Sequence, residues 1–269
     1  MIKTRYSDFT PEEIEYTIKL LNRKTPLPII RKKTKLSHNE ILSIIKKNNL
    51  PYEKEQLPIY TINDKAIIIS SDNHKGSRLE NKLYEQLIIS YARSHNIRTI
   101  INCGDEIQAQ IPPLRYGLNG QTNAYLSAYP GKNIVTLLLG GNHELRAIEK
   151  NPEIYNVLIS RRDVKFLGLG AAYLLWQGQL ISVHHSISKF DLDLPSAKCV
   201  MNFSGHHHFF NVVNNSSIYV PTSSDDLKKS DSKPGFLVAT LCGRKLVIKK
   251  NNLGKEIVEK GVVYSKNII

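Results

Sequence analysis

Apolar residues along the chain fall into two patterns, one typical of buried strands and one typical of amphipathic helices. Short apolar runs at residues 66–69, 99–102 and 134–139 predict buried strands. Between the first two runs, leucine and isoleucine recur at helical spacing across residues 79–88. Strands that alternate with helices in this way predict a parallel sheet whose strands are joined by helical crossovers.

The two ends of the chain show different patterns. Near the N-terminus, capping-box sequences at residues 10–13 and 37–40 predict two short helices, joined by a basic connector at residues 31–35. We expect this arm either to bind nucleic acid or to pack on the main domain as a helical cap with solvated lysines. After residue 170, short alternating segments predict antiparallel strands that form a second sheet edge.

Residues 107–133 have no clear period. Prolines and glycines punctuate this stretch, with Tyr116, Tyr125 and Tyr129 between them. Long loops beside an active-site strand are often functional, so we interpret these residues as a substrate-facing flap. A poorly ordered connector is the alternative interpretation.

Length and composition allow one large α/β domain with short appendages. The chain has 269 residues, of which 41% are hydrophobic, and a chain of this kind can bury a sizeable core. We expect a basic helical extension at residues 1–55, the main domain at residues 56–253 and a basic C-terminal tail at residues 254–269.

Features that indicate a compartment are few. No apolar run is long enough to span a bilayer and no signal peptide is visible, so we expect an intracellular, cytoplasmic protein without a membrane partner. The three cysteines are scattered along the chain, which favours a reducing compartment. The sequence does not indicate an oligomeric state.

The positive charge of the chain is concentrated at its two ends. The formal net charge is +13, of which residues 1–55 carry +5, residues 228–269 carry +7 and the middle carries +1. A basic surface attracts polyanions, and nucleic acid is the first candidate partner. The alternative interpretation is a lysine-rich surface that serves only solubility.

Polar residues that directly follow the apolar runs carry the candidate chemistry. The run at residues 134–139 leads into Gly140-Gly141-Asn142-His143-Glu144, and other runs end in a similar way. Because the carboxyl ends of parallel strands meet at one edge of a sheet, we expect these side chains to converge. Carboxylate, imidazole and amide oxygen together suit Mn²⁺, Fe²⁺ or Zn²⁺, and there are enough ligands for two ions. The residues concerned are Asp72, His74, Asp105, Asn142, His143, His184, His206 and His208.

These residues form five short motifs, and their order resembles a known family. Asp72-x-His74, Gly104-Asp105, Gly141-Asn142-His143-Glu144, His184 at a strand end and Gly205-His206-x-His208 occur in the order of the calcineurin-like metallophosphoesterases. The resemblance covers roughly residues 66–241. It implies an α/β fold in which two sheets form a four-layer αββα sandwich, here with a short helical N-terminal extension.

The resemblance also implies a cofactor and a role for each motif residue. Two divalent metal ions are expected, with Mn²⁺ first and Fe²⁺ or Zn²⁺ as alternatives. One ion would be held by Asp72, His74 and His208, the other by Asn142, His184 and His206, with Asp105 bridging the two. His143 is similar to the family's catalytic histidine, which protonates the leaving oxygen or steadies the transition state.

Some positions near the motifs leave a choice. Adjacent strand residues point to opposite sides, so only one of His184 and His185 can readily face the metals, and the family's His-Gly pattern favours His184. Asn73, Lys75 and Arg146 lie close enough in the sequence to contact a phosphate, with surface polar residues as the alternative. We interpret His207 as a wall of the pocket or a neighbour of the ligands.

Departures from the family pattern reduce the range of substrates that we expect. The first motif lacks the glycine that protein serine/threonine phosphatases have after the histidine, and residues 104–110 lack their Asp-Arg-Gly. We therefore expect a phosphodiesterase that acts on DNA or RNA through a two-metal-activated hydroxide, similar to the nuclease branch. The alternatives are an enzyme for nucleotides or other small phosphoesters and, since every motif position is filled, less plausibly a non-catalytic scaffold.

Overall fold

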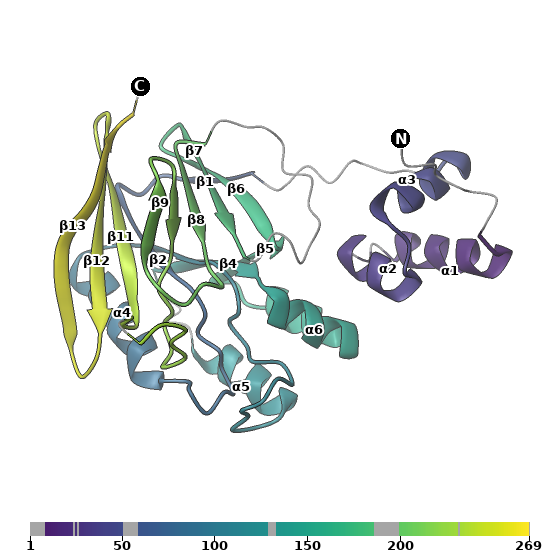
Figure 1. Ribbon diagram of the computed structural model, residues 1–269, viewed down its shortest axis with the longest axis horizontal. Coiled ribbons are helices and arrows are strands. Elements are labelled where there is room, and N and C mark those ends of the chain that lie inside the picture. Colours follow the sequence, from purple (N-terminus) through teal and green to yellow (C-terminus); the bar gives the residue numbers. More distant parts are fainter. Residues whose placement is uncertain are drawn as a thin grey trace. The chain divides into compact units, whose positions relative to one another are not determined.

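The chain folds as two compact units, Met1–Gln56 and Leu57–Ile269 (Figure 1). This computed structural model describes residues 9–23, 25, 27–50, 59–128, 133–185, 199–230 and 232–268. Within those ranges, no helix combines the length and the apolar character that a membrane span requires. Tyr129, part of the expected flap, lies outside the described residues.

Three helices make up the described part of the N-terminal unit. They are α1 (Pro11–Asn22), α2 (Leu27–Thr34) and α3 (His38–Lys47). Both predicted capping boxes form, because the Thr10 hydroxyl accepts the Glu13 amide at 3.2 Å and the Ser37 hydroxyl accepts the Glu40 amide at 3.3 Å. The capping boxes therefore predicted correctly where α1 and α3 begin.

Helix α2 corrects the expected connector between these helices. Residues 31–34 continue the helix instead of forming a loop. Ile30 is fully buried among apolar residues of α1 and α3, including Leu20, Ile41 and Ile44. The helix has only eight residues and its apolar residues precede its basic ones, so the sequence shows no clear helical period here.

One sheet of the larger unit has seven strands, in the order β13-β12-β11-β2-β3-β4-β5. Four parallel strands form one half: β2 (Ala66–Ser70), β3 (Thr99–Asn102), β4 (Val135–Gly140) and β5 (Val164–Leu169). Three antiparallel strands form the other half: β11 (Gly235–Cys242), β12 (Lys245–Leu253) and β13 (Ile257–Asn267). The apolar runs predicted β2, β3 and β4 of the parallel half, but not β5.

The second sheet has six strands, in the order β1-β6-β7-β8-β10-β9. Its strands are β1 (Ile59–Ile62), β6 (Ala171–Trp176), β7 (Gln179–His184), β8 (Met201–Ser204), β9 (Asn211–Asn214) and β10 (Ser217–Tyr219). Strands β6 and β7 pair antiparallel around a turn, as expected, whereas β7 and β8 run parallel. Both β7 and β8 therefore deliver their carboxyl ends to the same edge.

The two sheets pack face to face around one apolar core, which confirms the predicted α/β sandwich. Ile69 and Ile101 of the seven-stranded sheet and Trp176, Val183 and Phe203 of the six-stranded sheet are fully buried in this core. Because side chains of a strand alternate between its two faces, every second residue of these strands faces the other sheet.

Helices cover the outer face of the seven-stranded sheet. Helix α4 (Lys82–Ser94) buries Tyr84, Ile88 and Ala92 against Ile68 and residues of neighbouring strands. Helices α5 (Leu118–Ala128), α6 (Asn142–Lys150) and α7 (Glu153–Ile159) follow β3 and β4 in the chain. The crossover pattern inferred from the sequence is thus present, with the helices next to the parallel strands.

Two segments differ from the sequence-based expectation. The expected C-terminal tail from residue 254 forms β13, an edge strand that pairs with β12 and places Lys249 2.8 Å from Glu259. The expected irregular stretch contains α5, which is anchored by polar bonds from Tyr125 to the Leu158 carbonyl (2.8 Å) and from Gln121 to the Ala109 carbonyl (2.6 Å). Polar anchors of this kind leave no apolar period for a sequence pattern to detect.

The buried face of β8 provides a test of the sandwich core. Phe203→Ala removes a fully buried ring between the sheets and is expected to lower the free energy of unfolding by about 3–5 kcal/mol. Val213→Ala on β9, where the side chain is 43% exposed, should change it by less than about 0.5 kcal/mol. Urea unfolding of both variants measures the difference, and equal losses would contradict this placement of the core.

Candidate metal centre

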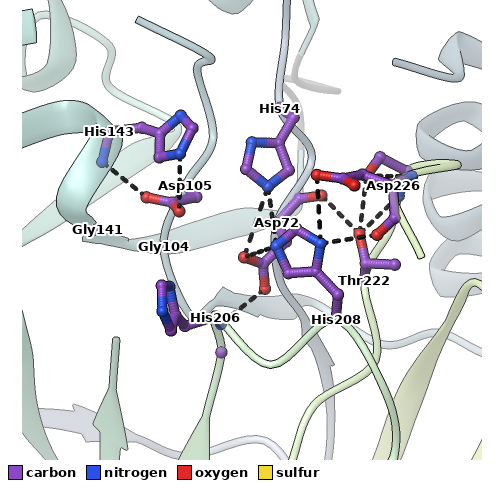
Figure 2. A network of polar contacts seen from close by, with 12 residues as sticks. Asp72, His74, Gly104, Asp105, Gly141, His143, His206, His208, Thr222 and Asp226 are labelled. Carbon is purple, nitrogen blue, oxygen red and sulfur yellow. Dashed lines mark hydrogen bonds and ion pairs between the residues drawn. The ribbon is translucent and has the colours of Figure 1, made fainter. Parts of the chain in front are cut away.

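Carboxyl ends of five strands from both sheets meet at the candidate site. Asp72 follows β2, Asp105 follows β3 and Asn142 begins α6 directly after β4. From the other sheet, His185 follows β7, and His206 and His208 follow β8. Figure 2 shows Asp72, His74 and His208 on one side of the site and Asp105, His143 and the ring of His206 on the other.

The loops that carry these residues adopt an unusual backbone conformation. Asp72, His74, Asp105, His206 and His208 all have positive φ angles, between 50° and 74°. This left-handed region is strained for residues with a Cβ and concentrates at functional sites. Backbone bonds hold the loops in place, for example from the Asp72 amide to the Gly104 carbonyl at 2.9 Å and from the His74 amide to the Asp105 carbonyl at 3.0 Å.

Gly141 is required by close approach rather than by its φ angle. A Cβ at this position would collide with the Asp105 carboxylate. The same carboxylate accepts the backbone amide of His143 at 2.9 Å through Oδ1. The glycine of the Gly-Asn-His-Glu motif therefore lets the start of α6 lie against Asp105.

Asp72, His74 and His208 form the first ligand group. Their side-chain nitrogen and oxygen atoms lie within 4.8 Å of one another, and all three residues are buried. His208 Nε2 lies 3.1 Å from Asp72 Oδ1, and His74 Nε2 lies 3.7 Å from the same oxygen. On its other side, His208 Nδ1 donates to the Asp226 carbonyl at 2.7 Å.

Asp105, His185 and His206 form the second ligand group. His185 Nε2 lies 2.9 Å from Asp105 Oδ2, and His185 Nδ1 donates to the Cys103 carbonyl at 2.7 Å. The ring of His206 stands 5.3 Å from that of His185, centroid to centroid. Among the described residues, the buried Nδ1 of His206 has no hydrogen-bond partner.

Asn142 and His143 complete the site from the first turn of α6. The Asn142 side chain is 8% exposed, and its Oδ1 lacks a hydrogen-bond partner among the described residues. His143 Nδ1 donates to the Gln108 carbonyl at 2.9 Å, which directs Nε2 towards Asp105 Oδ2 at 3.7 Å. The ring of His143 also lies edge-on to that of His74, with centroids 4.8 Å apart.

The arrangement fits divalent metal ions by the chemistry of its donors. A carbonyl can only accept, so His143, His185 and His208 each carry a proton on Nδ1 and direct Nε2 into the site. Histidines that bind a metal through one ring nitrogen usually donate the N–H of the other to a carbonyl or carboxylate in this way. The buried, unpartnered oxygen of Asn142 needs a cation or a donor that no described residue supplies.

Charges inside the site are strongly shifted. Burial alone would raise the pKa of Asp72 and of Asp105, but the surrounding histidines together outweigh it, led by His208 at Asp72 and by His185 at Asp105. The pKa of each carboxyl group therefore falls below its ordinary value. Burial opposes charge on His185, yet Asp105 raises the pKa of its imidazole to about 9. Both carboxylates are therefore ionised and depend on positive charge close by.

His185, and not His184, belongs to this site, so the expected position of His184 is wrong. His184 Nε2 lies 2.6 Å from Ser182 Oγ on the opposite face of β7. Ile181 and Val183 are buried between the sheets, and His185 continues the same phase. That alternation was present in the sequence, and it would have identified His185 had it been given more weight than the family's His-Gly pattern.

The remaining predicted residues occupy different positions. Asn73 donates to Glu106 Oε2 at 2.6 Å and so supports a neighbouring loop. Arg146 is exposed on α6, one turn beyond His143. His207 stacks on Tyr219 with ring centroids 3.6 Å apart and an interplanar angle of 16°.

Glu144 supports the Asp105 loop, a role that the sequence did not show. Its carboxylate is fully buried and accepts the backbone amides of Asp105 (3.0 Å), Gly141 (2.7 Å) and Ile107 (2.8 Å). Burial and then the charge of Asp105 raise the pKa of Glu144 to about 8. One side chain thus ties the loop after β3 to the start of α6.

Lys75 occupies the position where protein phosphatases have glycine, and it forms a buried ionic network. Its Nζ lies 2.7 Å from Glu85 and 3.1 Å from Glu106, with only 4% of the lysine side chain exposed. Burial opposes the charge, but the two glutamates outweigh it and raise the pKa of Lys75. Glu106 in turn accepts from Asn73 and Asn102, so the network braces the loops after β2 and β3.

Comparisons with known proteins give similar solved structures at low identity. The phosphoesterase Yfce from E. coli matches with a TM-score of 0.47 and 12% identity over 76% of this chain and 100% of its own. A predicted phosphoesterase from Streptococcus pneumoniae matches with a TM-score of 0.44 and 10% identity over 76% of this chain and 97% of its own. Vacuolar protein sorting 29 from Cryptosporidium parvum matches with a TM-score of 0.45 and 13% identity over 76% of this chain and 98% of its own. No protein-family model and no curated protein sequence matches the chain. At this level of likeness, function has to be argued from the residues of this chain.

The Lys75 network is expected to stabilise the fold. Lys75→Met leaves Glu85 and Glu106 without their cation and should lower the free energy of unfolding by about 3–5 kcal/mol. The matched control is Lys249→Met, which removes an ion pair with Glu259, a side chain that is 42% exposed. This variant should lower the free energy of unfolding by less than about 1 kcal/mol. Chemical denaturation measures both, and a small loss for Lys75→Met would show that the buried pairs are not supporting the loops.

The assignment of His185 can be tested against its neighbour. His185→Ala should weaken Mn²⁺ binding at least tenfold, because even outer partners of metal ligands are worth about 10–100-fold. His184→Ala, which removes a ring that contacts Ser182, should change the affinity far less. Isothermal titration calorimetry with Mn²⁺ gives both values. A larger loss for His184→Ala would restore the original assignment.

Proposed function

We propose that this protein is a metal-dependent phosphoesterase that hydrolyses phosphodiester bonds of nucleic acid. The observation that carries the proposal is the pairing of two buried carboxylates with inward-facing histidines where strand ends of both sheets meet. Asp72, His74 and His208 would hold one cation, and Asn142, His185 and His206 a second. Asp105 would contribute to both, since it belongs to one group with His74 and to another with His185 and His206.

Divalent cations bound there would neutralise phosphoryl oxygens and lower the pKa of water. The chain itself contributes a positioned imidazole, because the Gln108 carbonyl fixes the tautomer of His143 and aims its Nε2 at the site. Burial lowers the pKa of His143 to about 4, so its Nε2 carries no proton near pH 7 until an anion approaches. A phosphate ester beside the ring favours the protonated form, which can then donate to the departing oxygen.

Exposed cations next to the centre support nucleic acid as the substrate. Lys228 Nζ donates to the His206 carbonyl at 2.5 Å, so this ammonium group stands directly beside a proposed ligand. Lys229 is exposed beside it, and Arg146 is exposed one turn after His143. A polyanion that passes the site would meet these charges close to the reacting phosphate. Lys75 is buried and paired, so it is unavailable to such a substrate.

Nucleotides and other small phosphoesters are the second candidate class. They would use the same metal centre but would engage fewer of the surrounding cations, and their turnover would depend less on salt. A non-catalytic scaffold is the third, and the complete donor set argues against it.

Hydrolysis assays in Mn²⁺ test the proposal. Labelled single-stranded DNA and RNA, duplex DNA, a small phosphodiester and a phosphomonoester are incubated with the wild type, His143→Ala and His95→Ala. His143→Ala should reduce kcat at least 100-fold, as expected for loss of a general acid. His95 is exposed on the surface at the end of α4, and its variant should match the wild type.

The substrate range decides between the candidates. Cleavage of nucleic acid that falls steeply as salt rises would support the nuclease proposal. Turnover of only the small esters would assign the enzyme to nucleotide or metabolite hydrolysis. No turnover with Mn²⁺ demonstrably bound would favour the scaffold.

A further inference from the structure

Beside the proposed metal ligands lies a cluster of aromatic rings that the proposed reaction does not use. We call His207, Phe209 and Tyr219 the aromatic platform. His207 and Tyr219 are stacked with centroids 3.6 Å apart, and Phe209 meets both rings edge-on at 6.0 Å and 5.8 Å. Lys229 Nζ lies 3.8 Å from the centroid of the Phe209 ring.

A chain of ring contacts connects the platform to the metal centre. The His206 ring lies 5.3 Å from that of His185 on one side and 6.0 Å from that of His207 on the other. His207 sits between His206 and His208 in the sequence, so the platform is fixed to the same loop as two proposed ligands. A group bound on the platform would therefore lie next to a phosphate held at the centre.

The platform is not part of the core between the sheets. Its three rings are partly exposed, whereas Trp176, Phe203 and Phe236 are fully buried. The hairpin of β9 and β10 that carries Tyr219 forms the edge of the six-stranded sheet. Partly exposed, stacked aromatic rings beside lysines are the features with which proteins hold single-stranded nucleic acids.

We propose that the aromatic platform stacks an unpaired base next to the phosphodiester that is hydrolysed. The proposal rests on the proposed function and adds a substrate class to it, namely nucleic acid that is single-stranded at the cleavage position. In a duplex, the faces of the bases are covered by their neighbours, so the platform has nothing to stack on unless the strand opens. Lys228 and Lys229 would contact the phosphates on either side of the bound base.

Abasic substrates test the stacking directly. A short single-stranded oligonucleotide with one cleavable linkage is compared with versions that carry an abasic sugar on either side of that linkage. The wild type should cleave the complete oligonucleotide about 5- to 100-fold more efficiently than one of the abasic versions, the range expected for stacking one base. Tyr219→Leu and Phe209→Leu should lose this preference, so that each variant cleaves the complete and the abasic oligonucleotide with similar efficiency.

Tyr91→Leu is the matched control. Tyr91 stacks on His95 with centroids 3.8 Å apart and an interplanar angle of 15°, which reproduces the Tyr219–His207 pair on helix α4. Its loss removes an equivalent ring pair away from the proposed ligands and should leave the preference for the complete oligonucleotide intact. Thermal unfolding of all three variants checks that they are folded, and two separate platform variants guard against one that is not.

Binding measurements separate this inference from the proposed reaction. Fluorescence anisotropy with non-hydrolysable phosphorothioate versions of the same oligonucleotides requires no turnover. Tighter binding of the complete oligonucleotide that Tyr219→Leu abolishes would support the platform even if no substrate were hydrolysed, in which case the proposed reaction would fail alone. Equal cleavage and equal binding of complete and abasic oligonucleotides by the wild type would overturn the platform and leave the phosphoesterase proposal standing.

Discussion

Two ionised carboxylates buried at the meeting point of the sheets set the main constraint on this structure. Asp72 and Asp105 are at most 1% exposed, and an isolated charge in such a place costs far more than the stability of a domain allows. The fold answers by surrounding them with imidazoles and backbone amides, including the His206 amide on Asp72 (3.0 Å) and the His143 amide on Asp105 (2.9 Å). The negative charge of these carboxylates is what makes the site suited to cations. The same two groups therefore cause the free-energy cost of burial and support the proposed function.

A second set of buried polar groups holds the loops that carry these carboxylates. Glu144 accepts three backbone amides, and Glu106 and Glu85 share Lys75. Both networks lie behind the ligands and not in the proposed path of a substrate. Strained left-handed residues persist only when their surroundings over-determine them, and these networks supply that determination for Asp72, His74 and Asp105. Rigidity at the ligands is therefore obtained from groups that would never contact a phosphate.

The sequence predicts which residues follow each strand, because this depends only on the order of the strands. It does not predict contacts and orientations that depend on how a segment packs against the rest of the fold. Apolar runs ending in polar residues located Asp72, Asp105 and Asn142 correctly, because the end of a parallel strand has one destination whatever the rest of the fold does. His184 was chosen over His185 from a family pattern, although the phase of Ile181 and Val183 indicated the opposite. Helix α5 is not predicted because polar side chains anchor it and leave no apolar period. Strand β13 is not predicted because it is a charged edge strand without clear alternation of apolar residues. The partners of Lys75 and Glu144 are brought together by tertiary structure, and no local pattern in the sequence contains that information.

The position of the positive charge also changes what the sequence suggested. Much of the C-terminal excess lies on β12 and β13, where Lys249 is already paired with Glu259. Strand β13 is three strands from β2, about 14 Å at the usual strand spacing, which exceeds the screening length of about 8 Å at physiological salt. Charges on that edge can attract a polyanion at low salt but contribute little to holding it at the metal centre. Lys228 and Lys229, beside His206 and Phe209, are the cations whose distance allows them to act on a bound strand. In the proposed function, specific contact with a strand would therefore depend on a few lysines placed next to aromatic rings, and the net charge of the whole chain would be a poor measure of it.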